Sequence, residues 1–140
     1  MGSPAGAFRS AVDALLTSSP GALSGIVDVV RVYVEVPANA TLPYVLIGND
    51  QVILTQNDGC ADEAEIFSTV QWWSRTSPRD KGVQCRQMGS ALVDALATDL
   101  TVSGWEVVEW ECQSEEYSTD PDQSSRGRAV FRYLLTEIVA

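Results

Sequence analysis

The stretch from Glu63 to Ser74 reads EAEIFSTVQWWS, and it decides the fold because strand periodicity runs through all of it. Adjacent side chains of a strand point to opposite faces. One face of this stretch is apolar and carries Ile66, Val70 and Trp72. The other face is mostly polar, with Glu65, Thr69 and Gln71, but it also carries Phe67 and Trp73. The alternation predicts a strand whose first face lies in the core.

The two aromatic residues on the polar face have two interpretations. Exposed aromatics on such a face often mark a contact with another subunit or protein. Alternatively, a helix or loop of the same chain covers Phe67 and Trp73 within the monomer. The sequence supports these two interpretations equally.

A second predicted strand precedes this one, from Tyr44 to about Gln56. Gly48-Asn49-Asp50 interrupts its pattern and predicts a bulge or bend. Asn57-Asp58-Gly59 then gives a turn signal, so the second and third strands are expected to form an antiparallel hairpin.

Helical periodicity appears twice. Ala5 to Thr17 carries an apolar stripe made of Phe8, Val12, Leu15 and Leu16. A longer helix is expected to begin at Ser77-Pro78-Arg79-Asp80, with Ser77 as the cap, and to run to about Leu100. Its predicted buried stripe is Cys85, Met88, Leu92, Leu96 and Leu100.

The remaining strands complete the predicted fold. Val29 to Val36 is β-branched and alternating, and Trp105 to Tyr117 places Val108, Trp110 and Cys112 on one face. A polar hairpin tip at 118–127, with the turn Asp120-Pro121-Asp122, leads to a last strand from Arg128 to Val139. The buried face of that last strand is predicted to consist of Ala129, Phe131, Tyr133 and Leu135. The order α-β-β-β-α-β-β predicts an α+β domain over residues 1–140, an antiparallel or mixed sheet with helices on one face.

Composition excludes several classes of protein. The 140 residues and 15.1 kDa fit one domain, and the net charge is −10 without any histidine. A nucleic-acid binder carries a basic footprint, which this chain lacks. Without histidine there is no Ser-His-Asp triad, Cys-His pair or His-ligated metal. No apolar run approaches the ~18 residues that a membrane span needs. The first residues, Met1 to Gly6, show no basic region followed by an apolar core, so no secretory signal is visible there.

The cysteines and carboxylates do not form a predicted active site. Cys60, Cys85 and Cys112 are far apart and odd in number, which favours reduced structural thiols. Acidic residues gather around Asp58–Glu65 and along Glu106–Asp122, but the spacing matches neither a Ca²⁺ loop nor a glycosidase pair. We therefore predict no catalytic residue, no metal and no cofactor.

Several short motifs, in this order and spacing, resemble the tail terminator family of long-tailed bacteriophages, also called tail completion or tail-to-head joining proteins. They are Leu42-Pro43-Tyr44-Val45-Leu46-Ile47-Gly48, Trp73-Ser74-Arg75 before the long helix, and Asp120-Pro121-Asp122 followed by Arg128-Ala129-Val130-Phe131-Arg132. One departure is Gln123, where the family's motif has glycine. The 118–127 tip is also longer and more acidic than the family's hairpin.

The resemblance implies a structural virion protein of the neck and tail. Such a protein forms a hexameric ring on the head-proximal end of the tail tube, contacts the tube protein and a head-completion or connector protein, and lets DNA pass without sequence-specific binding. A net charge of −10 suits such a channel, because like charges repel. We expect the loops at 57–63 and 115–127 to reach a neighbouring ring. The candidate assembly interface is Asp58, Asp62, Phe67, Trp73, Arg75, Glu115, Glu116, Tyr117, Asp120, Asp122 and Arg126.

Two alternatives remain at this stage. One is another ring protein of the same particle, either a head-closure stopper or the tube subunit. The more distant one is a small ligand-binding domain, which would need convergent polar groups in a cleft.

Overall fold

The computed structural model describes residues 2–17, 23, 26, 31–55, 61–75, 80–98, 100–120 and 124–138. Its elements are α1 (Ala5–Thr17), β1 (Val32–Tyr33), β2 (Tyr44–Thr55), β3 (Glu63–Arg75), α2 (Val83–Thr98), β4 (Trp105–Thr119) and β5 (Ser124–Glu137). The order and the α+β class predicted from the sequence are both confirmed.

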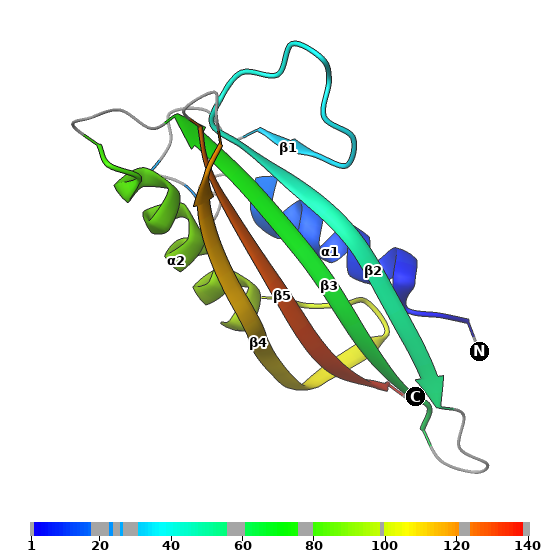
Figure 1. The fold of residues 1–140 in the computed structure, drawn as a ribbon. Coiled ribbons are helices and arrows are strands. Elements are labelled where there is room, and N and C mark those ends of the chain that lie inside the picture. Colours follow the sequence, from blue (N-terminus) through cyan, green and yellow to red (C-terminus); the bar gives the residue numbers. More distant parts are fainter. Residues whose placement is uncertain are drawn as a thin grey trace.

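The strands form one mixed sheet in the order β1-β2-β3-β5-β4. The short β1 runs parallel to β2, and all other neighbouring strands are antiparallel. The central strands β3 and β5 are long and twisted (Figure 1). At one end of the sheet the β4–β5 hairpin closes through a hydrogen bond from the Asp120 amide to the Ser124 carbonyl, 2.8 Å long.

Both helices lie on the same side of the sheet, behind it in the view of Figure 1. α1 packs on β1 and β2, whereas α2 packs on β3, β4 and β5. The core fills the space between helices and sheet. The predicted buried faces are confirmed for β3 and β5, because Ile66, Val70 and Trp72 and also Ala129, Phe131, Tyr133 and Leu135 are buried.

The core closes around Trp72, which is fully buried. Its indole N–H donates to the Cys85 carbonyl of α2 at 2.9 Å. Two glycines make room for the ring: Gly127 is its register partner on β5, and Gly89 faces it from α2. The Tyr133 hydroxyl of β5 donates to the Leu96 carbonyl of α2 at 2.6 Å, which is a second hydrogen bond between the sheet and this helix.

The long helix begins later than the sequence predicts. Residues 76–79, including the expected cap Ser77, lie outside the described residues. Asp80 caps instead, since its carboxylate accepts from the amides of Gly82 (3.0 Å) and Gln84 (3.1 Å). Lys81 and Gly82 have positive φ, which places the first helical residue at Val83. The helix ends at Thr98, so Leu100 packs against the core from outside it.

Two other boundaries differ from the prediction, and a predicted bulge is confirmed. Within the described residues the first strand is only Val32–Tyr33, because Val34 and Glu35 bend away after two residues of pairing. The polar hairpin tip is shorter than 118–127, because β4 continues to Thr119 and β5 starts at Ser124. The predicted bulge at Gly48-Asn49-Asp50 is confirmed by a register shift between Ile47 and Asp50.

The fourth strand corrects the predicted placement of one residue, Val108. Register shifts fall between Val107 and Glu109 and between Cys112 and Ser114. Each shift inserts an extra residue, which breaks the simple alternation. Trp110 and Cys112 share one face as predicted, because their register partners Tyr133 and Phe131 are both buried, whereas Val108 is the extra residue of the first bulge and is exposed by 49%.

Candidate assembly interface

The face of the sheet opposite the helices is open. No helix of the described ranges covers it, and Figure 1 looks onto this face. It carries a row of aromatic side chains at the end of the sheet where β1 pairs with β2. The Tyr44 and Trp73 rings stack with centroids 5.1 Å apart. The Tyr33 and Tyr44 rings form a T-shaped contact with centroids 5.8 Å apart. Trp73 thus remains half-buried on the open face, and Tyr44 packs against it.

The second predicted aromatic, Phe67, lies on the same open face three register rows from Trp73. Its neighbours across the strands are Gln51 on β2 and Arg132 on β5. Arg132 forms an ion pair with Glu65, so its charge is already compensated. Phe67 therefore sits in a mixed polar surface, whereas Trp73 belongs to an aromatic row.

Three of the predicted interface residues meet at one end of the sheet. Trp73, Arg75 and Asp120 line a hollow of about 420 Å³ together with Tyr44 and residues of the 40–42 loop. Arg126 is the register partner of Trp73 and is exposed on the same face. The sequence motifs around residues 44, 73 and 120 therefore converge in space.

Three other predicted residues lie outside this hollow, on the neighbouring strand β4. Glu116 is exposed on the open face opposite Arg128. Glu115 and Tyr117 instead face the helix layer and line a groove of about 380 Å³ between β4 and α2. There the Tyr117 hydroxyl donates to Glu115 at 2.9 Å and the Arg86 guanidinium lies 4.9 Å from the centre of the Tyr117 ring. Burial and the Glu115 carboxylate raise the pKa of Tyr117 well above its usual value.

The last three predicted residues are placed as follows. The Asp62 carbonyl accepts from the Glu137 amide at 2.9 Å, at the opposite end of the sheet from Trp73. Asp58 and Asp122 lie outside the described residues.

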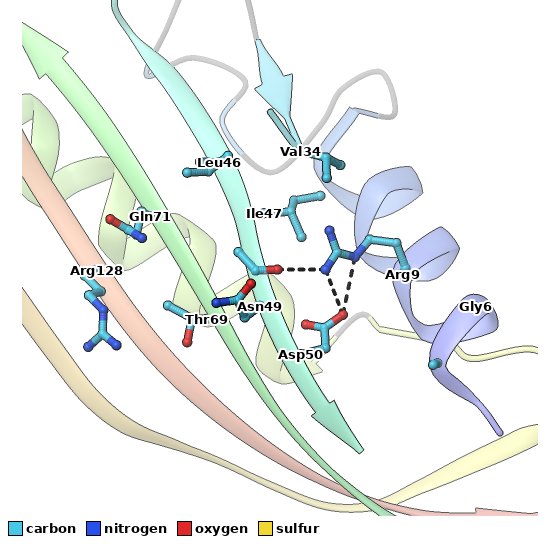
Figure 2. A pocket seen from close by; sticks show the side chains of 12 residues that line it. Gly6, Arg9, Val34, Leu46, Ile47, Asn49, Asp50, Thr69, Gln71 and Arg128 are labelled. Atoms are coloured by element: carbon cyan, nitrogen blue, oxygen red, sulfur yellow. Dashed lines mark hydrogen bonds and ion pairs between the residues drawn. The ribbon is translucent and has the colours of Figure 1, made fainter. Parts of the chain in front are cut away.

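A pocket of about 770 Å³ follows the β2 bulge, and its lining includes Arg9 of α1 and the open-face residues Gln71 and Arg128 (Figure 2). Arg9 donates to the Gly48 carbonyl at 2.7 Å and to the Asp50 carboxylate at 2.9 Å. The second oxygen of that carboxylate accepts from the Ser68 hydroxyl at 2.7 Å. Asp50 is thus satisfied by two partners, and the network ties α1 to the bulged strand rather than presenting a reactive group.

The described residues offer no cluster of metal ligands. Among them, no three histidine, cysteine, aspartate or glutamate side chains are grouped to hold a metal ion.

A search of the helices in the described ranges finds none with the length and apolarity needed to cross a bilayer.

Cys85 is the buried thiol of α2, and burial raises its pKa from 9.0 to about 11. Folding therefore favours the protonated thiol, and this stabilisation is complete below pH 9 and lost as the pH rises toward 11. We expect the wild type to lose more free energy of unfolding than Cys85→Ala between pH 8.5 and pH 10.5, by about 1.4 kcal/mol per pH unit at most. Urea titrations of both proteins at several pH values measure this difference. Equal losses would contradict the assignment.

Sequence reasoning missed three members of the open face. Tyr33, Tyr44 and Arg128 share it with Trp73 and Arg126, as the strand register shows. Because alternate residues of a strand share a face, the sequence could have predicted that Arg128 lies on the same face as Arg126. The pairing of β1 with β2, which brings Tyr33 to Tyr44, leaves no local signal in the sequence.

The comparisons with known proteins agree with the fold. A solved structure described as the virion of a native gene transfer agent (GTA) particle contains a chain with a TM-score of 0.68 and 20% identity. The alignment covers 94% of this chain and 96% of that one. No protein of curated function matches the sequence. Residues 10–136 match the family described as tail completion protein gp17. The chain therefore belongs to the tail completion protein family, as its motifs predicted, and is a structural component of a phage virion.

Proposed function

We propose that six copies of this chain form a ring on the head-proximal end of a phage tail tube, where the ring ends tube growth and joins tail to head. Membership of the tail completion family supports this role. The observation that carries the proposal is the open sheet face with its Tyr33–Tyr44–Trp73 row. Aromatic side chains on an uncovered face are typical of protein interfaces.

The two edges of the sheet support a ring in particular. Large exposed apolar side chains lie along both edges: Val34, Ile53 and Leu54 beside β1 and β2, and Val108 and Trp110 on β4. A contact between two different surfaces of one molecule repeats around a rotation axis until it closes. The proposed partners are the tail tube protein on one side of the ring and a head-completion or connector protein on the other. Phage DNA would pass through the centre.

The first test is the mass in solution, measured by light scattering over a wide concentration range with and without divalent cations. A ring predicts a discrete species of about 91 kDa, six times 15.1 kDa. Open-ended polymers would identify the tube subunit instead. A chain that remains monomeric even when tail tubes are added would contradict the ring and favour a ligand-binding domain.

Replacing Trp73 with Ala tests the face directly. We expect a folded protein that no longer assembles, because the aromatic row loses its largest side chain, the ring that stacks on Tyr44. Val83→Ala is the control, since Val83 is also an exposed apolar side chain but lies at the start of α2, away from the open face and from both sheet edges. Circular dichroism checks the fold and light scattering the assembly. Normal assembly of Trp73→Ala would count against this face.

A further inference from the structure

Three arginines on the open face have no partner of their own. Arg126 and Arg128 are alternate residues of β5, and Arg75 ends the neighbouring strand β3. In the described part of the chain, none of these three side chains forms a hydrogen bond or an ion pair. We call them the arginine patch.

The other described arginines are all engaged. Arg9 pairs with Asp50, and Arg132 with Glu65. Arg31 donates to the Pro43 carbonyl, and Arg86 lies over the Tyr117 ring. A chain with nine basic and nineteen acidic residues thus leaves three guanidinium groups together and uncompensated on one surface. That surface is suited to an anionic partner.

The complementary surface is present on the same molecule. Four exposed glutamates follow the open face of the edge strand β4, and we call them the glutamate margin: Glu106, Glu109, Glu111 and Glu116. Glu116 is the register partner of Arg128, yet the two form no ion pair within the described structure. The patch and the margin are therefore both available to a second copy.

We propose that the arginine patch of one copy binds the glutamate margin of the next copy. This inference rests on the proposed ring and assigns its contact surfaces. In the proposed ring this contact is heterologous, because each copy offers a different surface to each of its two neighbours. The Trp73 row lies beside the patch, because Trp73 is the register partner of Arg126, and supplies apolar area next to the charges.

Nucleic acid is the less suitable anion for this surface. Duplex DNA binding needs a broad basic footprint, and the net charge of −10 opposes the approach of phosphates. The patch is also bordered by carboxylates, with Glu116 opposite Arg128 and Asp120 in the hollow with Arg75.

Charge reversal tests the contact. Arg75→Glu with Arg126→Glu reverses the patch at residues without an acidic register partner, since Arg75 pairs with Ser124 and Arg126 lies between Trp73 and Ser118. Glu106→Arg with Glu109→Arg reverses the margin opposite Thr136 and Leu134. Each double variant is expected to raise the dissociation constant for self-association by at least about tenfold. An equimolar mixture of the two variants should restore assembly, because every contact in an alternating ring then joins opposite charges.

The control variant changes the net charge without touching the open face. Ser10→Glu, Lys81→Glu and Gln87→Glu are exposed positions around the helices, and together they change the charge by the same amount as the patch reversal. This control should assemble like the wild type. Light scattering at two salt concentrations is applied to the wild type, the two double variants, their mixture and the control. The wild-type association should weaken at high salt.

Two results would overturn the inference alone. In one, the wild type forms rings and the reversed variants do so equally well, or their mixture fails to recover. In the other, the wild type binds duplex DNA and the patch reversal abolishes that binding. A wild type that stays monomeric at all concentrations would instead contradict ring self-assembly, and the inference with it.

Discussion

Replacing Trp72 with Ala is expected to lower the free energy of unfolding by about 3–5 kcal/mol, the usual cost of deleting a large buried aromatic side chain. Trp72 is fully buried, its N–H is bonded to α2, and the edge of its ring meets Tyr117 with centroids 6.1 Å apart. Deleting it leaves a cavity between β3, β5 and α2. Urea unfolding followed by circular dichroism measures the loss without relying on tryptophan fluorescence.

The next residue is the matched control. Trp73→Ala removes the same number of atoms from the opposite face of the same strand, where the ring stacks on Tyr44 and is only half-buried. We expect a loss of about 1 kcal/mol for this variant. The two substitutions thus separate stability from assembly, since Trp72→Ala affects mainly the former and Trp73→Ala mainly the latter. Equal stability losses would show that the assignment of the two faces is wrong.

Period-two alternation explains why these faces were predictable. β3 and β5 are central strands with a neighbour on each side, so one face must be buried and the sequence alternates accordingly. β4 is an edge strand with two bulges, and nothing local in Val107 to Ser114 announces an extra residue. The simple alternation therefore put Val108 on the same face as Trp110 and Cys112, although Val108 is the extra residue of the first bulge.

For the candidate interface, strand periodicity predicted the face of single residues but not which of them lie together. Trp73 was identified as an aromatic on a polar face, and the strand register then adds Arg126 as its neighbour. Whether that face stays open depends on both helices packing on the other side, which is a property of the whole chain.

The start of α2 also depends on more than the local sequence. Ser77 and Asp80 are both good capping residues, and the positive φ of Lys81 and Gly82 decides in favour of Asp80.

Adding a single methyl group at Gly127 is expected to lower the free energy of unfolding by about 1–3 kcal/mol, as overpacking of a tight core does. A Cβ atom there would lie closer than 3.0 Å to three atoms of the Trp72 ring. Gly127 is paired with Trp72 on one side and with Tyr117 on the other, so its backbone has little room to withdraw. Its φ is not in the left-handed region, and the expected cost is therefore steric.

A double-mutant cycle tests this steric origin. Trp72→Phe shortens the ring that Gly127→Ala would strike, so the alanine should cost less in the Phe background than in the wild type. Gly6→Ala is the control, because a Cβ at Gly6 meets nothing within 4 Å and alanine favours the helix by up to about 1 kcal/mol. Additive effects at 72 and 127 would mean that the indole does not rest on Gly127. Coupling between them would show that this glycine is what lets β5 approach close enough to bury Trp72 while Trp73 stays on the open face.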